Sequence, residues 1–514
     1  MGGATGVESD HASVALDGAS LTLSEVELVA RGGAQVELDG ECLERVEASS
    51  RAVGRMVAAG EPVYGVNTGF GALSNRAVEP SDVTTLQHNL LRSHASGTGP
   101  LLDAEAARAV TVIRANSLAV GASGVRPVVI QRLIDILNAG IVPAIPEQGS
   151  LGASGDLAPL AHLALVLTGE GYVVEGGEAV PAGPALERAG IAPLALEAKE
   201  ALALINGTAF IAGVGALALQ DAERLLLTAI AVAALTAYAI GARREPFDPR
   251  LHQVRPHYGQ LRVAKLLETL LGPLDPAHRA TERVQDPYSI RCLPPAFGAA
   301  LDALGPLQDA LEVELNAATD NPLIFENDAL SGGNFHGHPL ALPIEYAKVG
   351  VASVGTMTER RIALLMDAGE YGLPAFLVAN PGLNSGFMIA HYLTAGLVAE
   401  NKVLAHPSAV DSVPTSANIE DFNSMGATAA RHFRDITRNV ERIVAVEALC
   451  AAQACDVRGI RPDGALGELY AAIRDVVRML ERDDRVMADD IEAVWRLIHA
   501  GELAGIAWKG AEIG

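Results

Sequence analysis

The feature that most constrains the fold is a run of eighteen residues without a charge, LLLTAIAVAALTAYAIGA, at 225–242. Its length is at the edge of what a membrane-spanning helix requires, which is about 17–25 residues. The run is rich in alanine rather than leucine, it continues a helical pattern that begins at Asp221, and no second run accompanies it. We therefore expect a helix that is buried on all sides within a bundle and no insertion in a membrane.

Further long helical patterns follow along the chain, and their lengths exceed the usual mean of ~11–12 residues. Together with the first run they are predicted at 197–243, 296–318, 339–366, 387–405, 421–456 and 463–500. Short loops between such helices favour antiparallel neighbours. The sequence thus predicts a mainly α fold, an elongated bundle of long helices with a smaller N-terminal region. The expected regions are 1–200, 201–460 and 461–514.

Local signals predict the shorter elements of the first 200 residues. The stretch SVALDGASLTL, at 13–23, alternates around Asp17-Gly18 and predicts a β-hairpin. Ser24 followed by Glu27 predicts a capping box at the start of a short helix. Further helices are predicted at about 40–59, from Asp103 to Val120, from Pro127 to Gly140 and at 157–168, and a surface hairpin at 170–184.

Composition excludes several classes of partner. The formal net charge of −24 repels phosphate backbones, so nucleic acid is not expected to bind. The four cysteines form no Cys-x-x-Cys pair, and in a chain of 514 residues they indicate no disulfide framework. The first residues, MGGATGVESDH, lack the basic and apolar regions of a signal peptide. A cytoplasmic protein is expected.

The stretch GSLGASGD, at 149–156, consists almost entirely of small or turn-forming residues between two apolar helical patterns. A tight bend there could press the amide nitrogen of Gly155 against the carbonyl carbon of Ala153. Ring closure, followed by loss of water from the ring and from the Ser154 hydroxyl, would leave an electrophilic methylidene group. Because Gly-Ala-Ser-Gly also occurs at 121–124, where it joins two helices, the tetrapeptide alone does not decide for this chemistry.

The longer segment GSLGASGDLAPLAHLAL, at 149–165, resembles the aromatic amino acid ammonia-lyase and aminomutase family. The resemblance covers about residues 30–460 and includes YGVNTGFG at 64–71 and QDPYSIRC at 285–292. It implies a fumarase/aspartase-like bundle whose N-terminal region carries the cofactor, 4-methylidene-imidazole-5-one, with no external cofactor. Ala153, Ser154 and Gly155 would form this group. It also implies a homotetramer whose active sites are shared between subunits.

The resemblance assigns roles to residues that lie far apart in the sequence. Tyr64 would be the catalytic base, for which its ordinary pKa of ~10 must be lowered by neighbours. Arg291 would bind the substrate carboxylate through its planar fork. Asp156 would support the strained turn. The remaining residues expected to bind substrate or orient the cofactor are His94, Asn206, Gln285, Tyr288, Phe335 and Met388.

The reaction implied is loss of ammonia from a small α-amino acid to give a 2-enoate. Ser93-His94 and the carboxylate of Glu420, in place of an amide, resemble the histidine branch of the family, because a carboxylate can hold an imidazole N–H. Tyrosine or phenylalanine lyases and 2,3-aminomutases are the alternatives. His336 and His338 lack plausible third and fourth metal ligands, so loop packing is expected.

Two functions from other classes are the further alternatives. A serine hydrolase that uses Ser154 would require Gly-x-Ser-x-Gly, and Asp156 occupies the place of the last glycine. A helical scaffold without catalytic activity is disfavoured by the presence of Tyr64, Arg291 and the cofactor tripeptide. Both alternatives fit the sequence less well than a lyase.

Overall fold

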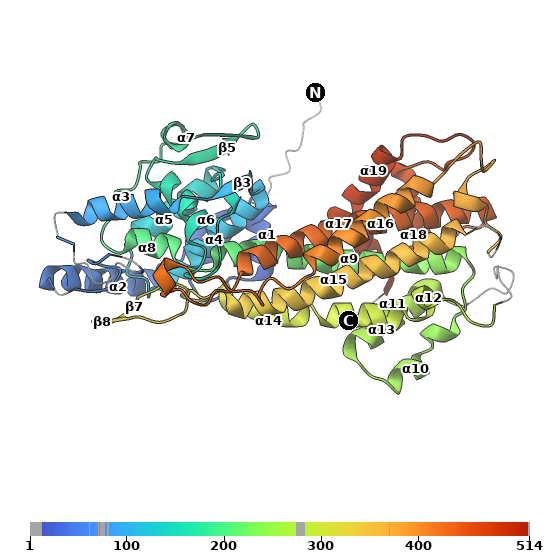
Figure 1. Ribbon diagram of the computed structural model, residues 1–514, viewed down its shortest axis with the longest axis horizontal. Coiled ribbons are helices and arrows are strands. Elements are labelled where there is room, and N and C mark those ends of the chain that lie inside the picture. Colours follow the sequence, from blue (N-terminus) through green and yellow to red (C-terminus); the bar gives the residue numbers. More distant parts are fainter. Residues whose placement is uncertain are drawn as a thin grey trace, which may run out of the picture. The chain divides into compact units, whose positions relative to one another are not determined.

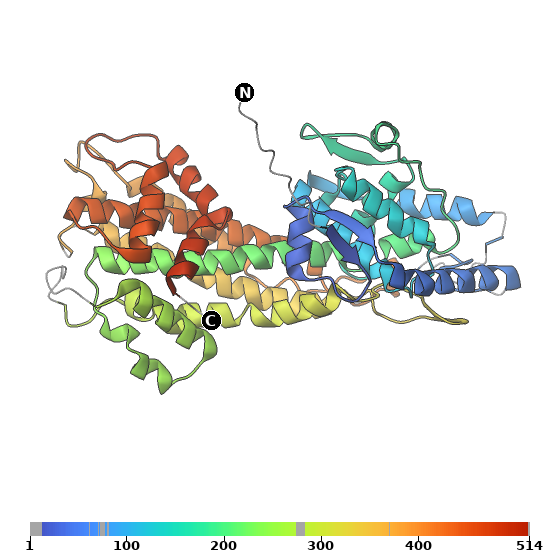
Figure 2. The same ribbon diagram turned by 180° about the vertical axis from the view of Figure 1, so that it is seen from behind.

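The computed structural model describes residues 13–60, 62–69, 71, 78–79, 82–273, 283–367, 369 and 371–511. The chain forms two compact units, each assembled from three stretches. The first unit comprises Met1–Leu217, Gln308–Ile344 and Ser408–Arg431, and the second comprises Ala218–Leu307, Glu345–Pro407 and His432–Gly514. The predicted mainly helical fold is confirmed (Figures 1 and 2). The three regions expected from the sequence stay a prediction.

The first unit contains most of the short elements. In chain order they are β1 (Ser13–Leu16), α1 (Leu23–Ala30), β2 (Gln35–Leu38), α2 (Gly40–Ala59), α3 (Val83–His94), β3 (Thr98–Leu101), α4 (Ala104–Ala119), α5 (Pro127–Asn138), β4 (Pro146–Gln148), α6 (Leu157–Leu167), β5 (Tyr172–Glu175), β6 (Glu178–Pro181), α7 (Ala182–Arg188), α8 (Glu200–Ile205), β7 (Leu323–Phe325), β8 (Asp328–Leu330) and η6 (Ser416–Asn418). The described strands pair as two-stranded sheets, β1 with β2, β3 with β4, β5 with β6 and β7 with β8.

The core of the first unit surrounds α4 and α6, whose residues are almost all buried. Asp103 caps α4 as predicted, since its side chain accepts the N–H of Ala106. The hairpin predicted at 170–184 is confirmed by antiparallel β5 and β6. The predicted ends of α2, α5 and α6 also agree with the structure within a few residues. These elements form where a cap or a terminating glycine agrees with the apolar pattern.

The predicted hairpin at 13–23 is wrong. Strand β1 pairs in parallel with β2, and α1 lies between them in the chain. The carboxylate of Asp17 accepts the N–H groups of Ala19 and Ser20, and the N–H of Gly18 donates to Asn116 on α4. The turn therefore leads into a helix instead of a second strand. The capping box belongs to Thr22 and Glu25, two residues before the predicted pair.

Four helices contain residues of both units: α9 (Ala209–Ala239), α14 (Gly305–Glu314), α15 (His338–Met366) and α17 (Gly426–Arg458). Among the described residues the second unit adds η3 (Glu245–Phe247), α10 (Pro249–Gln253), α11 (Tyr258–Leu271), α12 (Tyr288–Arg291), α13 (Leu293–Asp302), η5 (Ala375–Leu377), α16 (Met388–Leu404), α18 (Gly464–Val476), α19 (Met487–His499) and α20 (Glu502–Ala511). Three patterns predicted as single helices are divided, at 206–208, 303–304 and 477–486. Periodicity continues across these breaks, and so it did not reveal them.

Helix α9 contains residues 225–239 of the uncharged run at 225–242. It is long and apolar enough to cross a membrane by length and composition, and 78% of its most apolar window is buried inside the protein. In the second unit its Thr236 donates a hydrogen bond to Glu447 on α17, with 2.7 Å between the two oxygens. The prediction of a helix buried within a bundle is confirmed.

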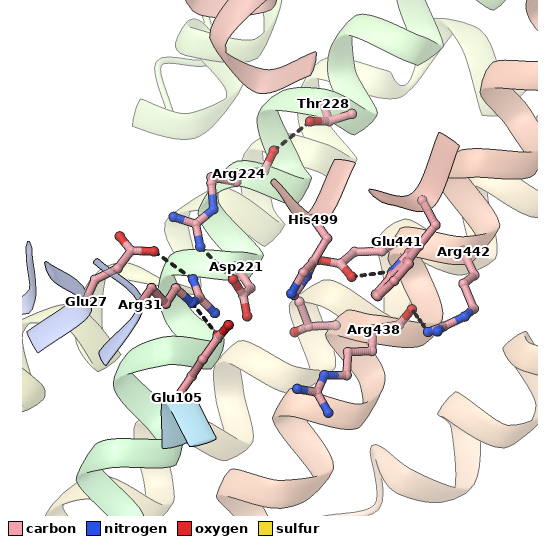
Figure 3. A network of polar contacts seen from close by, with 12 residues as sticks. Glu27, Arg31, Glu105, Asp221, Arg224, Thr228, Arg438, Glu441, Arg442 and His499 are labelled. Atoms are coloured by element: carbon pink, nitrogen blue, oxygen red, sulfur yellow. Dashed lines mark hydrogen bonds and ion pairs between the residues drawn. The ribbon is translucent and has the colours of Figure 1, made fainter. Parts of the chain in front are cut away.

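Ion pairs fix the long helices of the second unit. Arg361 on α15 forms a fork-like pair with Glu447 on α17, at 2.6 and 2.7 Å, and both side chains are completely buried. Figure 3 shows a second anchor on α17, where Glu441 contacts His499 of α19. In the first unit Arg31 bridges Glu27 and Glu105, as the same figure shows.

We predict that Arg361→Met lowers the free energy of unfolding by about 3–5 kcal/mol, because it leaves Glu447 buried without its cation. Replacing Glu447 by leucine as well should recover most of the loss. Denaturant titrations would measure both changes. The matched control is Arg51→Met in the exposed pair with Glu47, where the loss should stay below about 1 kcal/mol. Equal losses in the two single variants would contradict the prediction.

Candidate active site

A cavity of about 610 Å³ opens in the first unit. Its described lining residues all belong to that unit and come from loops and from α3, α6, α8 and η6. Seven residues predicted for the active site line it: Tyr64, His94, Ala153, Ser154, Asn206, Phe335 and Glu420. Gly155 lines a smaller cavity, which shares His94, Ser154 and Glu420 with the first. The structure thus brings together most of the first-unit residues that the sequence predicted for the active site.

The backbone of Gly155 lies directly against that of Gly207. The two residues form an isolated parallel bridge, and the N–H of Asp156 donates to the Gly207 carbonyl oxygen at 2.7 Å. A Cβ added to Gly155 would lie 2.4 Å from that oxygen and 2.5 Å from the Gly207 nitrogen. Since Gly155 also has a φ of +71°, only glycine fits at this position.

The amide of Asn206 fixes the next carbonyl group along the tripeptide. Its Nδ2 donates to the main-chain oxygen of Ser154 at 2.5 Å, and the Asn206 side chain is buried. Asn206 is the C-cap of α8, where the chain turns into α9. The break between α8 and α9 therefore places an amide donor at the wall of the cavity.

The carboxylate of Asp156 fixes the turn through two hydrogen bonds. One carboxylate oxygen accepts from the Ser150 hydroxyl at 2.7 Å, and the other accepts from the N–H of Ile211 at 3.0 Å. Burial raises the pKa of Asp156 to about 7, although these hydrogen bonds oppose the rise. Ser150 was not predicted as a site residue, and its place within the same small-residue stretch was the available signal.

Tyr64 contributes a phenol to the cavity. Burial raises the pKa of Tyr64 above its ordinary value; the N–H of Gly71, 3.4 Å from the hydroxyl oxygen, opposes the rise, and Glu420 adds to it. The expectation that neighbours lower this pKa is therefore wrong for the single chain. Among the described residues that line the cavity there is no lysine or arginine to stabilise a phenolate. Phe70, in the same motif, lies outside the described residues.

His94 and Glu420 meet at both cavities. Burial lowers the pKa of His94, while the Leu90 carbonyl, 2.9 Å from Nδ1, and the Glu420 carboxylate oppose the change. Glu420 is held in a tight loop by main-chain and side-chain hydrogen bonds to Thr415. An imidazole and a carboxylate thus face the same space, and together they can bind a small polar ring.

His336 and His338 pack against Phe422, in agreement with the packing predicted for them. The rings of His336 and Phe422 are stacked, with 5.6 Å between centroids and an angle of 3°. His336, Phe422 and Asn321 line the main cavity, and none of them was predicted to do so. Asn321 lies in an Asp-Asn-Pro turn, a pattern that predicts a turn and gives no sign of the cavity.

The other four predicted residues belong to the second unit. Gln285 and Tyr288 are exposed, Tyr288 to 69%, and the guanidinium of Arg291 lies 4.5 Å from the Tyr288 ring centroid. Met388 begins α16, and the carboxylate of Asp484 accepts the N–H groups of Ser385 and Gly386 just before it. The structure gives these four side chains no place in the cavity of the first unit.

Comparison with known proteins identifies the family of the chain. Residues 21–478 match the family model of the aromatic amino acid lyases. The chain belongs to the aromatic amino acid lyase family. This confirms the resemblance seen in the sequence and makes the protein an enzyme of the lyase class.

Individual members of the family resemble the chain over nearly its whole length. Histidine ammonia-lyase from Symbiobacterium thermophilum is 49% identical over 490 residues, which cover 95% of this chain and 96% of that one. The crystal structure of histidine ammonia-lyase from Trypanosoma cruzi has a TM-score of 0.89 at 40% identity and covers 97% of this chain and 95% of its own. Tyrosine aminomutase from Streptomyces globisporus has a TM-score of 0.92 at 38% identity, with coverages of 98% and 99%.

The described geometry fits the cofactor implied by the resemblance. The close approach of Gly155 to Gly207 constrains the tripeptide backbone, and the same backbone forms part of the cavity wall. The Asn206 amide donates to the carbonyl oxygen that the ring would retain. The first unit thus contains the tripeptide, its tight turn and a donor to the Ser154 carbonyl group.

The raised pKa of Asp156 predicts a specific dependence of stability on pH. Below pH 3.8 its carboxyl group is protonated in both the folded and the unfolded chain, and its full contribution to stability is present. That contribution is lost as the pH rises through about 7, and the loss is on the order of 4 kcal/mol. Asp156→Asn should therefore gain stability relative to the wild type between pH 4 and pH 7, as measured by denaturant titrations.

The exposed Asp328→Asn serves as the control and should follow the wild type over the same range of pH. A difference in unfolding free energy between Asp156→Asn and the wild type that does not change with pH would contradict the prediction.

Proposed function

We propose that the protein is a histidine ammonia-lyase that converts L-histidine to trans-urocanate and ammonia, the first step of histidine degradation. The observation that carries the proposal is one cavity in which Ala153 and Ser154 face His94, Glu420 and Tyr64. The histidine ammonia-lyases among the relatives support this choice of substrate. The reaction removes ammonia without oxidation, so atoms balance with no further reactant.

The cofactor in this proposal is 4-methylidene-imidazole-5-one, formed from Ala153, Ser154 and Gly155. It supplies an electrophilic carbon that makes the amino group of the substrate a better leaving group. Asn206 donates to the Ser154 carbonyl and would stabilise negative charge that develops on this oxygen, as oxyanion donors do. Asp156 would keep the turn in its strained form through Ser150 and Ile211.

Side chains around the substrate would remove the β-proton and bind the ring. Tyr64 would remove the β-proton, and His94 and Glu420 would hold the imidazole ring through its nitrogens. Phe335 would pack beside the substrate at the cavity wall. Because the phenol of Tyr64 has a raised pKa in the single chain, its action as a base requires a cation from outside the cavity.

A second chain can supply that cation, and we therefore propose a homotetramer with shared active sites. Arg291 of another subunit would bind the substrate carboxylate, and Gln285, Tyr288 and Met388 would accompany it. The second unit presents large apolar side chains to solvent along two long helices, which would be covered in an oligomer. They are Tyr346 and Val349 on α15 and Ile389, Tyr392, Leu393 and Val403 on α16. A soluble cytoplasmic enzyme without metal or nucleic acid completes the proposal.

Another activity of the same family is the alternative, namely a tyrosine or phenylalanine ammonia-lyase or a 2,3-aminomutase. The fold similarity to a tyrosine aminomutase favours keeping it. The substrates of the two candidate activities differ in how they can interact with Glu420. The imidazole of histidine can donate a hydrogen bond to a carboxylate, and a phenyl ring cannot. Substrate choice is therefore tested at this residue.

We predict that Glu420→Gln lowers kcat/KM for L-histidine by about 10- to 100-fold, the cost of losing a hydrogen bond to a charged group. Turnover of tyrosine and phenylalanine should not fall with it. Formation of urocanate and of the corresponding acrylates would be followed by absorbance. Unchanged turnover of histidine would refute the role of Glu420, and turnover of tyrosine alone by the wild type would favour the alternative.

Tyr64→Phe removes the proposed base and should lower kcat by about 10² to 10⁴-fold, the usual contribution of a general base. The matched control is Tyr172→Phe on β5, where the tyrosine is 56% exposed and is not one of the residues that line the cavity. This control should retain the activity of the wild type. Steady-state kinetics on L-histidine measure both variants, and equal activity of the two would contradict the role of Tyr64.

A further inference from the structure

Arg114 is a buried cation that the proposed reaction does not use. It lies on α4, and its side chain is completely buried. Its Nη2 donates to the main-chain oxygen of Ala203 on α8, its Nη1 lies 3.5 Å from the hydroxyl oxygen of Thr319, and its Nε has no hydrogen-bond partner among the described residues. The guanidinium therefore acts mainly on a main-chain carbonyl group.

Two carboxylates attract this guanidinium, but each is already occupied. Asp320 forms a completely buried ion pair with Lys199 at 2.6 Å and also accepts from Ser123. Asp156 accepts from Ser150 and Ile211. Burial lowers the pKa of Arg114 to about 10, and both carboxylates oppose the change, so the side chain stays charged at neutral pH. A buried cation without a direct ion pair is costly, and a local role is the natural explanation.

The position of Arg114 relative to the cofactor turn supplies that role. A Cβ added to Gly207 would lie 2.3 Å from Nη1 of Arg114 and 2.6 Å from the Thr319 hydroxyl oxygen. Gly207 in turn contacts Gly155 through the backbone approach described above. Arg114, Gly207 and Gly155 are thus in successive contact, and a shift of the guanidinium would be passed to the nitrogen that must attack Ala153.

We propose that Arg114 is a positioning residue for the backbone cyclisation of the chain, acting through Gly207 on Gly155. The inference rests on the proposed function, because it assumes that the cofactor forms. Arg114 fixes the end of α8 through the Ala203 carbonyl and so sets the path of the following Asn206-Gly207 turn. It holds the turn in place before and during ring closure and exchanges no proton with the reacting atoms.

The cyclisation balances without any other reactant. The Gly155 nitrogen forms a bond to the carbonyl carbon of Ala153. The former carbonyl oxygen leaves as water with the hydrogens from the Gly155 and Ser154 nitrogens, and a carbon–nitrogen double bond forms within the ring. The Ser154 hydroxyl then leaves as a second water with the α-hydrogen of Ser154. Ring closure, the first step, depends on the distance between the Gly155 nitrogen and the Ala153 carbonyl carbon, which Arg114 would control.

The test is Arg114→Lys, which keeps the charge and loses the planar fork. Intact mass and peptide mapping would follow the two-water deficit of the peptide with residues 153–155 at fixed times after synthesis. The deficit should appear at least about tenfold more slowly than in the wild type, because small misplacements of reacting atoms cost up to ~10²-fold in rate. Circular dichroism would establish that the variant is folded.

The matched control is Arg108→Lys on the same helix, where the guanidinium also donates to main-chain carbonyls, those of Val29 and Leu137. It should lose stability yet complete the deficit at the wild-type rate, which separates positioning from general support of the fold. Should Arg114→Lys fail to fold, Thr319→Val removes the hydroxyl beside Nη1 at nearly constant volume and should also slow the deficit.

The outcomes distinguish the inference from the proposed function. A wild-type chain with its full translated mass would overturn both. A complete deficit in the wild type, with equally fast completion in folded Arg114→Lys, would overturn the inference alone. Where Arg114→Lys does not fold, an unchanged rate in Thr319→Val would do the same. A slow deficit confined to the Arg114 and Thr319 variants would establish the positioning role.

Discussion

The contact between the backbones of Gly155 and Gly207 is the constraint on which the first unit depends. No side chain fits between these two residues, and the main-chain hydrogen bond from Asp156 to Gly207 fixes their register. Around this contact the chain has arranged completely buried polar groups, which are costly unless they are paired. Ser150, Ile211 and Asn206 satisfy the groups nearest to the turn. Hydrogen bonds therefore hold the cavity wall at the turn where the proposed cofactor would form.

The second unit is stabilised by a different kind of interaction. Many alanine side chains of α9 and α17 are buried, and the buried pair of Arg361 and Glu447 connects α15 with α17. The same arginine approaches the Ser289 carbonyl oxygen, with Nη1 at 3.5 Å, within the loop that carries Tyr288 and Arg291. The pair thus links the stability of the bundle to the position of two predicted substrate-binding residues.

The electrostatics of the cavity explain why a single chain is an incomplete catalyst in the proposed mechanism. Tyr64, His94 and Glu420 supply a phenol, an imidazole and a carboxylate, and the described lining contains no lysine or arginine. Burial without a cation raises the pKa of the phenol, which opposes its use as a base. A substrate carboxylate would add further negative charge. In the proposed tetramer, Arg291 from another subunit supplies positive charge both for the phenol of Tyr64 and for the substrate carboxylate.

The sequence by itself determined the features that depend on near neighbours. The cap of α4 at Asp103, the end of α2 and the buried character of α9 could all be predicted, because short motifs and apolar periodicity encode them. Only the tertiary structure decided the parallel pairing of β1 with β2 and the breaks within three long helical patterns. It also decided the raised pKa of Tyr64 and the position of Arg114 beside Gly207. These features depend on contacts between residues far apart in the chain and on burial, and neither is encoded in a local pattern.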